Sequence, residues 1–159
     1  MKIISGGQTG ADQAALDAAI ALNIPYGGWL PKGRKTENGP LPLRYALGEL
    51  PTTGYRDRTR KNIVAADATL IFSFGPLSGG SALTEALAIR YNRPFLHIDF
   101  DLIDPVQAAA LVENWLRGLE PETLNVAGPR ASNEPRIYQA VYSLLTGLRW
   151  PESPTREPR

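Results

Sequence analysis

Two glycine-rich turns carry the residues of this chain that are best suited to chemistry. Residues 5–12 read Ser-Gly-Gly-Gln-Thr-Gly-Ala-Asp, and residues 75–84 read Gly-Pro-Leu-Ser-Gly-Gly-Ser-Ala-Leu-Thr. Each turn follows a short β-branched run and precedes an alanine-rich segment that favours a helix. A strand-to-helix turn of this kind exposes backbone N–H groups at the positive end of the helix, where oxyanions bind. The two turns therefore predict one crevice that binds a phosphorylated small molecule.

The side chains of these turns have separate expected roles. Glycines allow close backbone approach, and hydroxyl groups can donate to an anion, although Thr84 could instead bond to its own preceding turn. Asp12 either offsets the dipole of its helix or accepts a hydrogen bond from an amine or ring nitrogen of the ligand. The predicted ligand contacts are Gly6, Gly7, Gln8, Thr9, Gly10 and Asp12 in the first turn, and Gly79, Gly80, Ser81 and Thr84 in the second.

Basic residues are concentrated between the two turns. Residues 32–61 hold eight Lys or Arg against three acidic residues, a net charge of +5, which leaves −4 for the rest of the chain. A local basic patch on a protein of net charge +1 favours a compact anionic ligand over a long polyanion, although a solvated helix face would look the same. Lys32, Arg34 and Arg56 are the expected charges at the mouth of the crevice, and Arg130 is a further anion clamp.

Composition narrows the possible chemistry. The absence of cysteine excludes thiolate nucleophiles, disulfides and metal–thiolate sites, and the single His97, expected in or near the core, excludes a histidine-rich metal site within one chain. We therefore expect no protein-ligated metal. No apolar run approaches the roughly 20 residues that span a bilayer, and the chain enters a strand at once, so the cytoplasm is the expected location.

Periodicity predicts a single α/β domain over residues 1–148, followed by a Pro-rich tail over 149–159. Strands alternate with helices, which predicts a mostly parallel, five-stranded sheet with helices on both faces. If the first and third strands are neighbours, both turns meet at the carboxyl edge of the sheet. The expected strands are 2–5, 26–30, 68–74, 94–100 and 123–127, and the expected helices are 9–22, 55–66, 80–91, 105–119 and 134–148.

Two common nucleotide motifs do not fit these turns. The first turn lacks the G-x-G-x-x-G pattern, and the second strand ends without an acidic residue for a ribose, which disfavours NAD and FAD. The run 28–36, Gly-Trp-Leu-Pro-Lys-Gly-Arg-Lys-Thr, has Arg34 where a phosphate-binding loop needs lysine. The long connection over 31–53 exceeds the usual length of an unstructured loop and is expected to be functional.

With these residues in view, the chain resembles the molybdenum carrier family, the molybdenum cofactor carrier proteins. The matching segments are 5–19, 27–42, 55–72, 79–88 and 123–132, and the runs 6–12 and 28–34 are the most specific. The resemblance implies a Rossmann-like fold, shared with DNA-processing protein A and the lonely-guy (LOG) hydrolases. It also implies a homo-oligomeric dimer or tetramer that shelters the molybdenum cofactor (molybdopterin), or binds molybdate or tungstate, without catalysis.

Two other functions stay open. A LOG-type enzyme would split the N-glycosidic bond of a nucleoside 5′-monophosphate, and its P-G-G-x-G-T-x-x-E pattern resembles the second turn. Here Glu85 stands one residue early, which rotates its side chain about 100° around the helix and away from the ribose. Binding of single-stranded DNA would need an extended basic groove with stacking aromatic residues, so a nucleic-acid partner is not expected.

Overall fold

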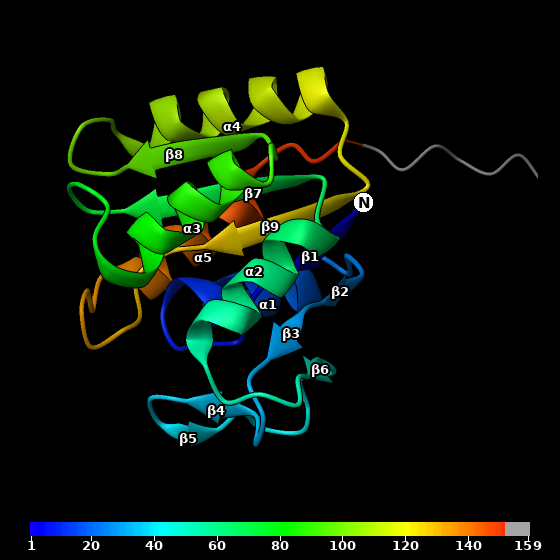
Figure 1. Cartoon of the computed structure of the whole chain (residues 1–159). Coiled ribbons are helices and arrows are strands. Elements are labelled where there is room, and N and C mark those ends of the chain that lie inside the picture. The colour runs from blue at the N-terminus through cyan, green and yellow to red at the C-terminus, as the bar shows by residue number, and fades with distance from the viewer. Residues whose placement is uncertain (152–159) are drawn as a thin grey trace, which may run out of the picture.

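Residues 1–151, the part of the chain that the computed structural model describes, form a three-layer α/β domain (Figure 1). The main sheet has five strands, all parallel, in the order β2-β1-β9-β7-β8. The predicted fold class, a Rossmann-like domain with a parallel five-stranded sheet, is confirmed. The strands are β1 (Lys2–Ile4), β2 (Tyr26–Gly27), β7 (Ala68–Ser73), β8 (Phe95–Asp99) and β9 (Thr123–Ala127).

The strand order corrects one expectation about the two turns. The strands that precede them, β1 and β7, are not neighbours, because β9 pairs with both. In the register of this pairing, Asn125 of β9 is opposite Ile4 of β1 and Thr69 of β7. The carboxyl end of β9 therefore lies between the two turns, and its following loop becomes part of the site.

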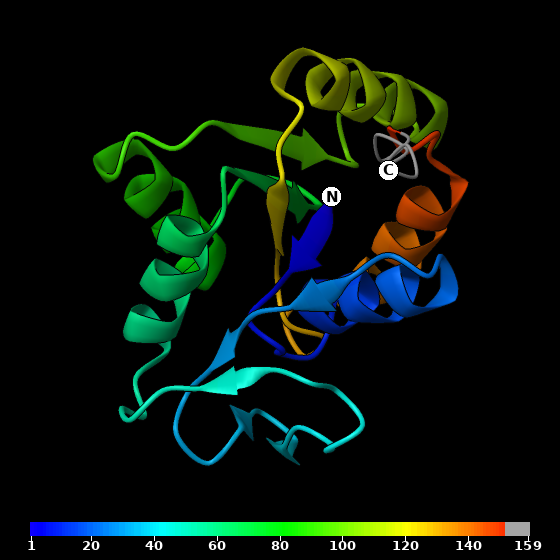
Figure 2. The ribbon, with the colours of Figure 1, turned by 90° about the vertical axis from the view of Figure 1, so that its right-hand side faces the viewer.

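Helices cover both faces of the sheet (Figure 2). Buried residues of α1 (Ala11–Ala21), α4 (Pro105–Leu119) and α5 (Ile137–Gly147) share one core cluster with the sheet. On the other face, α2 (Tyr55–Ala65) and α3 (Gly79–Arg90) form a second cluster around Ile63, Leu87 and Ala88. The alanines of α1 are buried, and such small side chains let this helix lie close to its neighbours.

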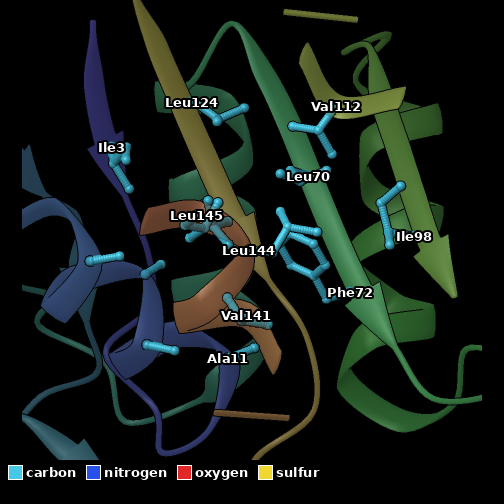
Figure 3. Packing of buried hydrophobic residues seen from close by; sticks show 14 of the residues in the cluster. Ile3, Ala11, Leu70, Phe72, Ile98, Val112, Leu124, Val141, Leu144 and Leu145 are labelled. Atoms are coloured by element: carbon cyan, nitrogen blue, oxygen red, sulfur yellow. The ribbon is translucent and has the colours of Figure 1, made fainter. Parts of the chain in front are cut away.

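The main core lies between the sheet and the helices α1, α4 and α5 (Figure 3). Leu70 and Phe72 of β7 are fully buried and face Val112 of α4 and Val141 of α5. A run of six buried residues identifies β7 as a strand covered on both sides, as parallel strands usually are. This rigid centre fixes the position of the second turn, which follows β7 directly.

The expected strand over 26–30 is divided. Gly28 has φ of 126° and separates β2 from β3 (Trp29–Leu30), which leaves the main sheet and pairs with β6 (Gly48–Glu49). A second small pair joins β4 (Lys35–Thr36) to β5 (Gly39–Pro40). The long connection is thus locally ordered, and Leu41 and Tyr45 anchor it in a small core with Leu16 and Leu30.

The beginning of the expected tail is attached to the domain. The Trp150 indole packs on the main core and donates to the carbonyl of Leu145 at 2.8 Å, and the Arg149 amide donates to Glu113 at 2.9 Å. The rest of the predicted Pro-rich segment, residues 152–159, lies outside the described residues. Among the helices of residues 1–151, none is long and apolar enough to cross a bilayer.

Candidate functional site

A cavity of about 400 Å³ opens at the carboxyl edge of the sheet. This volume lies within the range of small-molecule sites, about 300–1,000 Å³. Four segments form its walls: the first turn, the start of α2, the second turn with the start of α3, and the loop after β9. Of the predicted ligand contacts, the residues that line it are Gly6, Gln8, Asp12, Gly79, Gly80, Ser81, Thr84 and Arg130.

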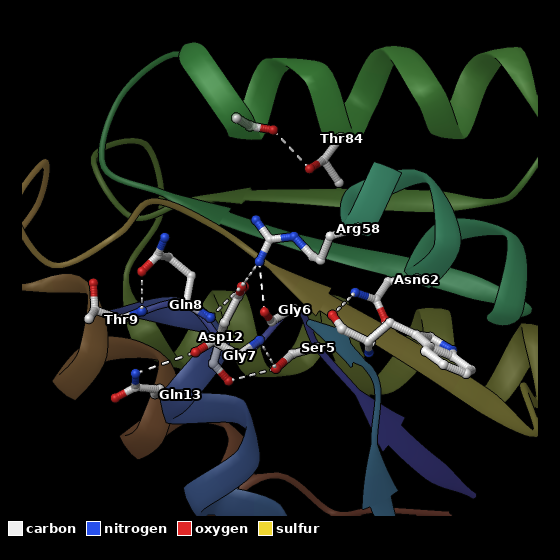
Figure 4. A network of polar contacts seen from close by, with 12 residues as sticks. Ser5, Gly6, Gly7, Gln8, Thr9, Asp12, Gln13, Arg58, Asn62 and Thr84 are labelled. Carbon is white, nitrogen blue, oxygen red and sulfur yellow. Dashed lines mark hydrogen bonds and ion pairs between the residues drawn. The ribbon is translucent and has the colours of Figure 1, made fainter. Parts of the chain in front are cut away.

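The first turn does not offer a row of free amides. The Gln8 amide donates to the Asp12 carboxylate at 3.1 Å, the Thr9 amide to the Gln8 side chain at 3.0 Å, and the Ala11 amide to the carbonyl of Pro129 at 3.2 Å. Side chains of the turn itself thus occupy two of these amides (Figure 4), and the loop after β9 occupies the third. Gly7, Thr9 and Gly10 do not line the cavity, so our expectation of an oxyanion cradle here needs correction.

The glycines of the first turn make room for the protein itself. A Cβ at Gly6 would lie 2.2 Å from Nη1 of Arg58, and a Cβ at Gly10, where φ is 79°, would lie 2.5 Å from the carbonyl oxygen of Pro129. What approaches the backbone at Gly6 is thus an arginine of α2 rather than a ligand. Gly10 allows the loop after β9 to pack against the start of α1.

Arg58 supplies the buried positive charge of the cavity. Its Nη1 donates to the Gly6 carbonyl at 2.7 Å and lies 3.4 Å from Oδ2 of Asp12. Its Nε is buried without an acceptor among residues 1–151, and only 11% of its side chain is exposed. Figure 4 shows the guanidinium between Asp12 and the helix that carries Thr84. Nη2 of Arg58 has no acceptor among the described residues either and, unlike Nε, is not sealed off, so an oxyanion in the cavity can accept from it.

The second turn keeps its amides available. Ser78 precedes α3 without a side-chain cap, and its carbonyl accepts from the amides of Ser81 and Ala82. Gly79 and Gly80 are exposed at the helix start, and their amides donate to no acceptor in the described part of the chain. The Thr84 hydroxyl donates to the Gly80 carbonyl at 2.9 Å, which is the structural role that competes with ligand binding. The first amides of α3 are therefore the groups of this turn that are free to donate a bond to a ligand, as helix N-termini do to anions.

The basic residues expected at the mouth lie elsewhere. Arg34 has φ of 57° and donates to the carbonyls of Leu41, Pro42 and Tyr45, so its guanidinium holds the long connection together. Lys32 and Arg56 are exposed and do not line the cavity.

The prediction from the sequence named Arg56 and not Arg58. The spacing of residues in α2 nevertheless indicates which face of this helix lies next to the sheet. Arg58 and Asn62 are four residues apart in α2 and share the face next to the sheet. The Asn62 side chain exchanges two hydrogen bonds with the backbone of Trp29, at 2.9 and 3.1 Å. The spacing of four residues between Arg58 and Asn62 thus indicates that Arg58 lies on the buried face of α2.

Glu37 of the long connection joins three segments at the rim of the cavity. Its carboxylate accepts from the hydroxyls of Thr9 and Ser132 and from the Ser132 amide, and it lies 3.5 Å from Nε of Arg130. Desolvation opposes ionisation, but the hydrogen bonds from Ser132 and Thr9 outweigh it and lower the pKa of Glu37. Arg130, the predicted anion clamp, is half-exposed and turned toward this carboxylate.

We expect Glu37→Gln to destabilise the fold by about 1–2 kcal/mol, because the amide replaces a carboxylate that accepts charge-assisted bonds. Since the folded-state pKa of Glu37 is lowered, its contribution is present above the unfolded pKa and is lost as the pH falls. The difference in free energy of unfolding between wild type and variant should therefore shrink in acid. Urea unfolding at several pH values measures it, and a difference that does not change with pH would contradict this role.

Asp12 is a buried carboxylate in the cavity wall. Burial raises its pKa from an ordinary 3.8 to about 6, although Arg58 and the Gln8 amide act in the opposite direction. The residue is 7% exposed. A carboxyl group with a pKa near 6 changes charge close to neutral pH, and such groups cluster at functional sites.

The raised pKa makes Asp12 a pH-dependent cost to the fold. Below the unfolded pKa, Asp12 is protonated in both the folded and the unfolded state, so it does not lower the free energy of unfolding. Between about pH 4 and 6 the loss of stability grows, and above pH 6 it reaches its full size. The rise from 3.8 to about 6 corresponds to roughly 3 kcal/mol. We expect wild type to lose stability relative to Asp12→Asn as the pH rises from 4 to 7, measured by chemical unfolding. Parallel pH profiles for the two proteins would refute the shift.

His97 and Ser73 form a further polar pair, of which Ser73 lines the cavity. Nε2 of His97 lies 2.6 Å from the Ser73 hydroxyl, which donates to the Gly75 carbonyl at 2.6 Å. Since this hydroxyl has one hydrogen, His97 donates to Ser73, and the pair holds the second turn in place. Within residues 1–151, no three His, Cys, Asp or Glu side chains gather as a metal site.

Fold and site together define a Rossmann-like α/β protein with a small-molecule-sized cavity between the turns after β1, β7 and β9. The chain belongs to the circularly permutated YpsA SLOG family, whose model matches residues 3–148. It is also similar to a crystal structure of a putative molybdenum carrier protein from Syntrophus aciditrophicus SB. The two share 56% sequence identity and a TM-score of 0.90, over 91% of each chain.

A second solved structure, of (E)-4-hydroxy-3-methyl-but-2-enyl diphosphate reductase, matches 93% of this chain and 59% of that one. Its TM-score of 0.41 and 12% identity carry no argument. No curated protein matches the chain significantly.

Proposed function

We propose that this protein binds the molybdenum cofactor, a phosphorylated pterin with an oxo-metal group, and protects it as a carrier or storage protein without catalysis. The observation that carries the proposal is the pairing of two anion-binding elements across one cavity: the free amides at the start of α3 and the buried Arg58 guanidinium. The similar molybdenum carrier supports the choice of cofactor.

The cavity suits an anionic, partly apolar ligand. The amides of Gly79 and Gly80 would hold the terminal phosphate or an oxo group, with the positive end of α3 behind them. Arg58 would hold a second oxyanion through Nη2, which has no acceptor among the described residues and is not sealed off. Tyr55, Phe74 and Leu83 add apolar surface for a ring. The bound cofactor would keep its own metal chemistry, and the residues of this chain would only orient and enclose it.

The LOG-type alternative gains no support from the geometry. Glu85, the acid nearest to the expected hydrolase position, does not line the cavity. We further propose, from family resemblance, that the carrier works in the cytoplasm as a homo-oligomer, dimer or tetramer. Light scattering of the purified protein tests the oligomeric state.

The test of function is to incubate the purified protein with isolated molybdenum cofactor and to separate bound from free by gel filtration. We expect molybdenum, measured by mass spectrometry, and pterin, measured by fluorescence after oxidation, to co-elute with the protein. In parallel, AMP is incubated with the protein and released adenine is quantified. If the protein binds neither pterin nor molybdate, the carrier proposal is wrong. If adenine is released from AMP, the protein is instead a hydrolase of the LOG type.

A further inference from the structure

Two buried side chains of the first turn each keep one polar atom uncommitted. Gln8 and Asp12 are both 7% exposed and both line the cavity. They lie next to Arg58 (Figure 4), across the cavity from the start of α3. Their function is not explained by anion binding, since one is neutral and the other is an acid.

The orientation of the Gln8 amide is fixed by its neighbours. Its Oε1 accepts from the backbone amides of Thr9 at 3.0 Å and Glu37 at 2.9 Å. Two N–H donors at one end require the oxygen there, so the nitrogen must occupy the other end. Nε2 makes no hydrogen bond within residues 1–151, and it is not sealed off. Gln8 thus presents a donor to the cavity.

The Asp12 carboxylate likewise has one bonded oxygen and one oxygen without a partner among the described residues. Its Oδ2 accepts from the Gln8 amide and lies 3.4 Å from Nη1 of Arg58. For Oδ1, no donor is found among the described residues, and this oxygen too is not sealed off. Asp12 therefore presents an acceptor, and the first turn offers one donor and one acceptor to the same ligand.

We propose that Gln8 and Asp12 read the lactam edge of a heterocycle, in which a ring C=O accepts from Gln8 Nε2 and the adjacent ring N–H donates to Asp12 Oδ1. The proposal rests on the proposed function and narrows its ligand class. The site takes phosphorylated heterocycles with a –CO–NH– edge, such as pterins and 6-oxopurines, with the phosphate at the start of α3.

An aminopurine presents the reverse pattern. The ring nitrogen of an adenine places an acceptor against the Asp12 oxygen, and the 6-amino group places a donor against the Gln8 nitrogen. Both contacts leave a buried polar group unpaired, which a site built for hydrogen bonding rejects strongly. Discrimination between oxo and amino rings is therefore the signature of this arrangement.

The experiment measures, by isothermal titration calorimetry, the binding of GMP, IMP and AMP as probes of the ring edge. We expect GMP and IMP, which both carry the lactam, to bind at least about tenfold more tightly than AMP. In Asp12→Asn, the side-chain oxygen stays with its two donors and the new amide nitrogen faces the cavity. The ratio of GMP to AMP affinity should then fall at least about tenfold.

Glu85→Gln is the matched control, because it makes the same acid-to-amide change on α3 outside the cavity, and its affinity ratio should equal that of wild type. Equal affinity of wild type for GMP, IMP and AMP overturns the inference, and this comparison needs no variant, so a misfolded Asp12→Asn does not obstruct it.

6-Hydroxymethylpterin phosphate separates the two proposals. If it binds while GMP, IMP and AMP bind with equal affinity, the carrier proposal stands, and the proposal that Gln8 and Asp12 recognise the lactam edge fails. If GMP and IMP bind more tightly than AMP but neither the pterin phosphate nor the molybdenum cofactor binds, the proposed lactam recognition stands and the carrier proposal fails. If no probe binds, both are wrong.

Discussion

Arg58→Met is expected to reduce the affinity for phosphate and molybdate about a hundredfold. The wild-type guanidinium lies in the cavity wall, and its Nη2 has no acceptor among residues 1–151 and is not sealed off, so a bound oxyanion would gain a charge-assisted hydrogen bond there. Bonds to charged groups contribute roughly 1.5–3 kcal/mol each, and roughly 2.8 kcal/mol corresponds to a hundredfold change in Kd. Calorimetric titration with each anion measures the loss.

Arg56→Met is the matched control for this prediction. Arg56 stands two residues earlier on the same helix, is exposed and does not line the cavity, so its loss should change the affinity less than about twofold. Equal losses in the two variants would mean that the helix acts only through its overall charge. Arg58→Lys should lie between wild type and Arg58→Met, because lysine keeps the charge but not the planar fork.

The same substitution should change stability in a pH-dependent way. Arg58 holds down the pKa of Asp12, so its removal raises that pKa further and leaves the buried carboxylate without its cation. Below about pH 5 the group is protonated in either protein, and the variant should be little destabilised by this effect. Above pH 6 the destabilisation should grow with pH, as chemical unfolding of the two proteins would measure.

Gly80→Asp is expected to abolish anion binding while leaving the melting temperature unchanged or slightly raised. A Cβ at Gly80 would meet nothing within 4 Å, and its φ is not in the left-handed region, so the fold tolerates a side chain. A carboxylate in the first turn of α3 interacts favourably with the helix dipole but repels a ligand anion from the same amides. Calorimetry for binding and thermal unfolding for stability give the two readouts.

Gly80→Asn is the isosteric control for that charge, and it should bind the anion within a few-fold of wild type. Gly79 is a poorer position for the test, since its φ of 50° makes any side chain there strained. Gly79→Asp is therefore expected to destabilise the fold modestly. If Gly80→Asp binds phosphate as wild type does, the start of α3 is not the anion site.

Local signals in the sequence were sufficient for most elements. The expected strand over 123–127 matches β9 at both ends, and Asp104 caps α4 with Gln107 in a capping box, where Asp-Pro had predicted a helix start. The strand over 26–30 was predicted as continuous. The positive φ of Gly28, which separates β2 from β3, cannot be recognised from the sequence around it. Such signals depend only on neighbours along the chain.

The sequence by itself determined the alternation of strands and helices, the two turns at one edge of the sheet, and the absence of cysteine chemistry. Only the tertiary structure decided that β9 lies between the turns, that Arg58 rather than Arg56 lines the cavity, and that the amides of Gln8, Thr9 and Ala11 are already bonded. The physical reason is distance along the chain: Arg58 meets Asp12 across 46 positions, and Glu37 meets Ser132 across 95. Whether a backbone donor is free depends on partners that only the folded chain brings within reach.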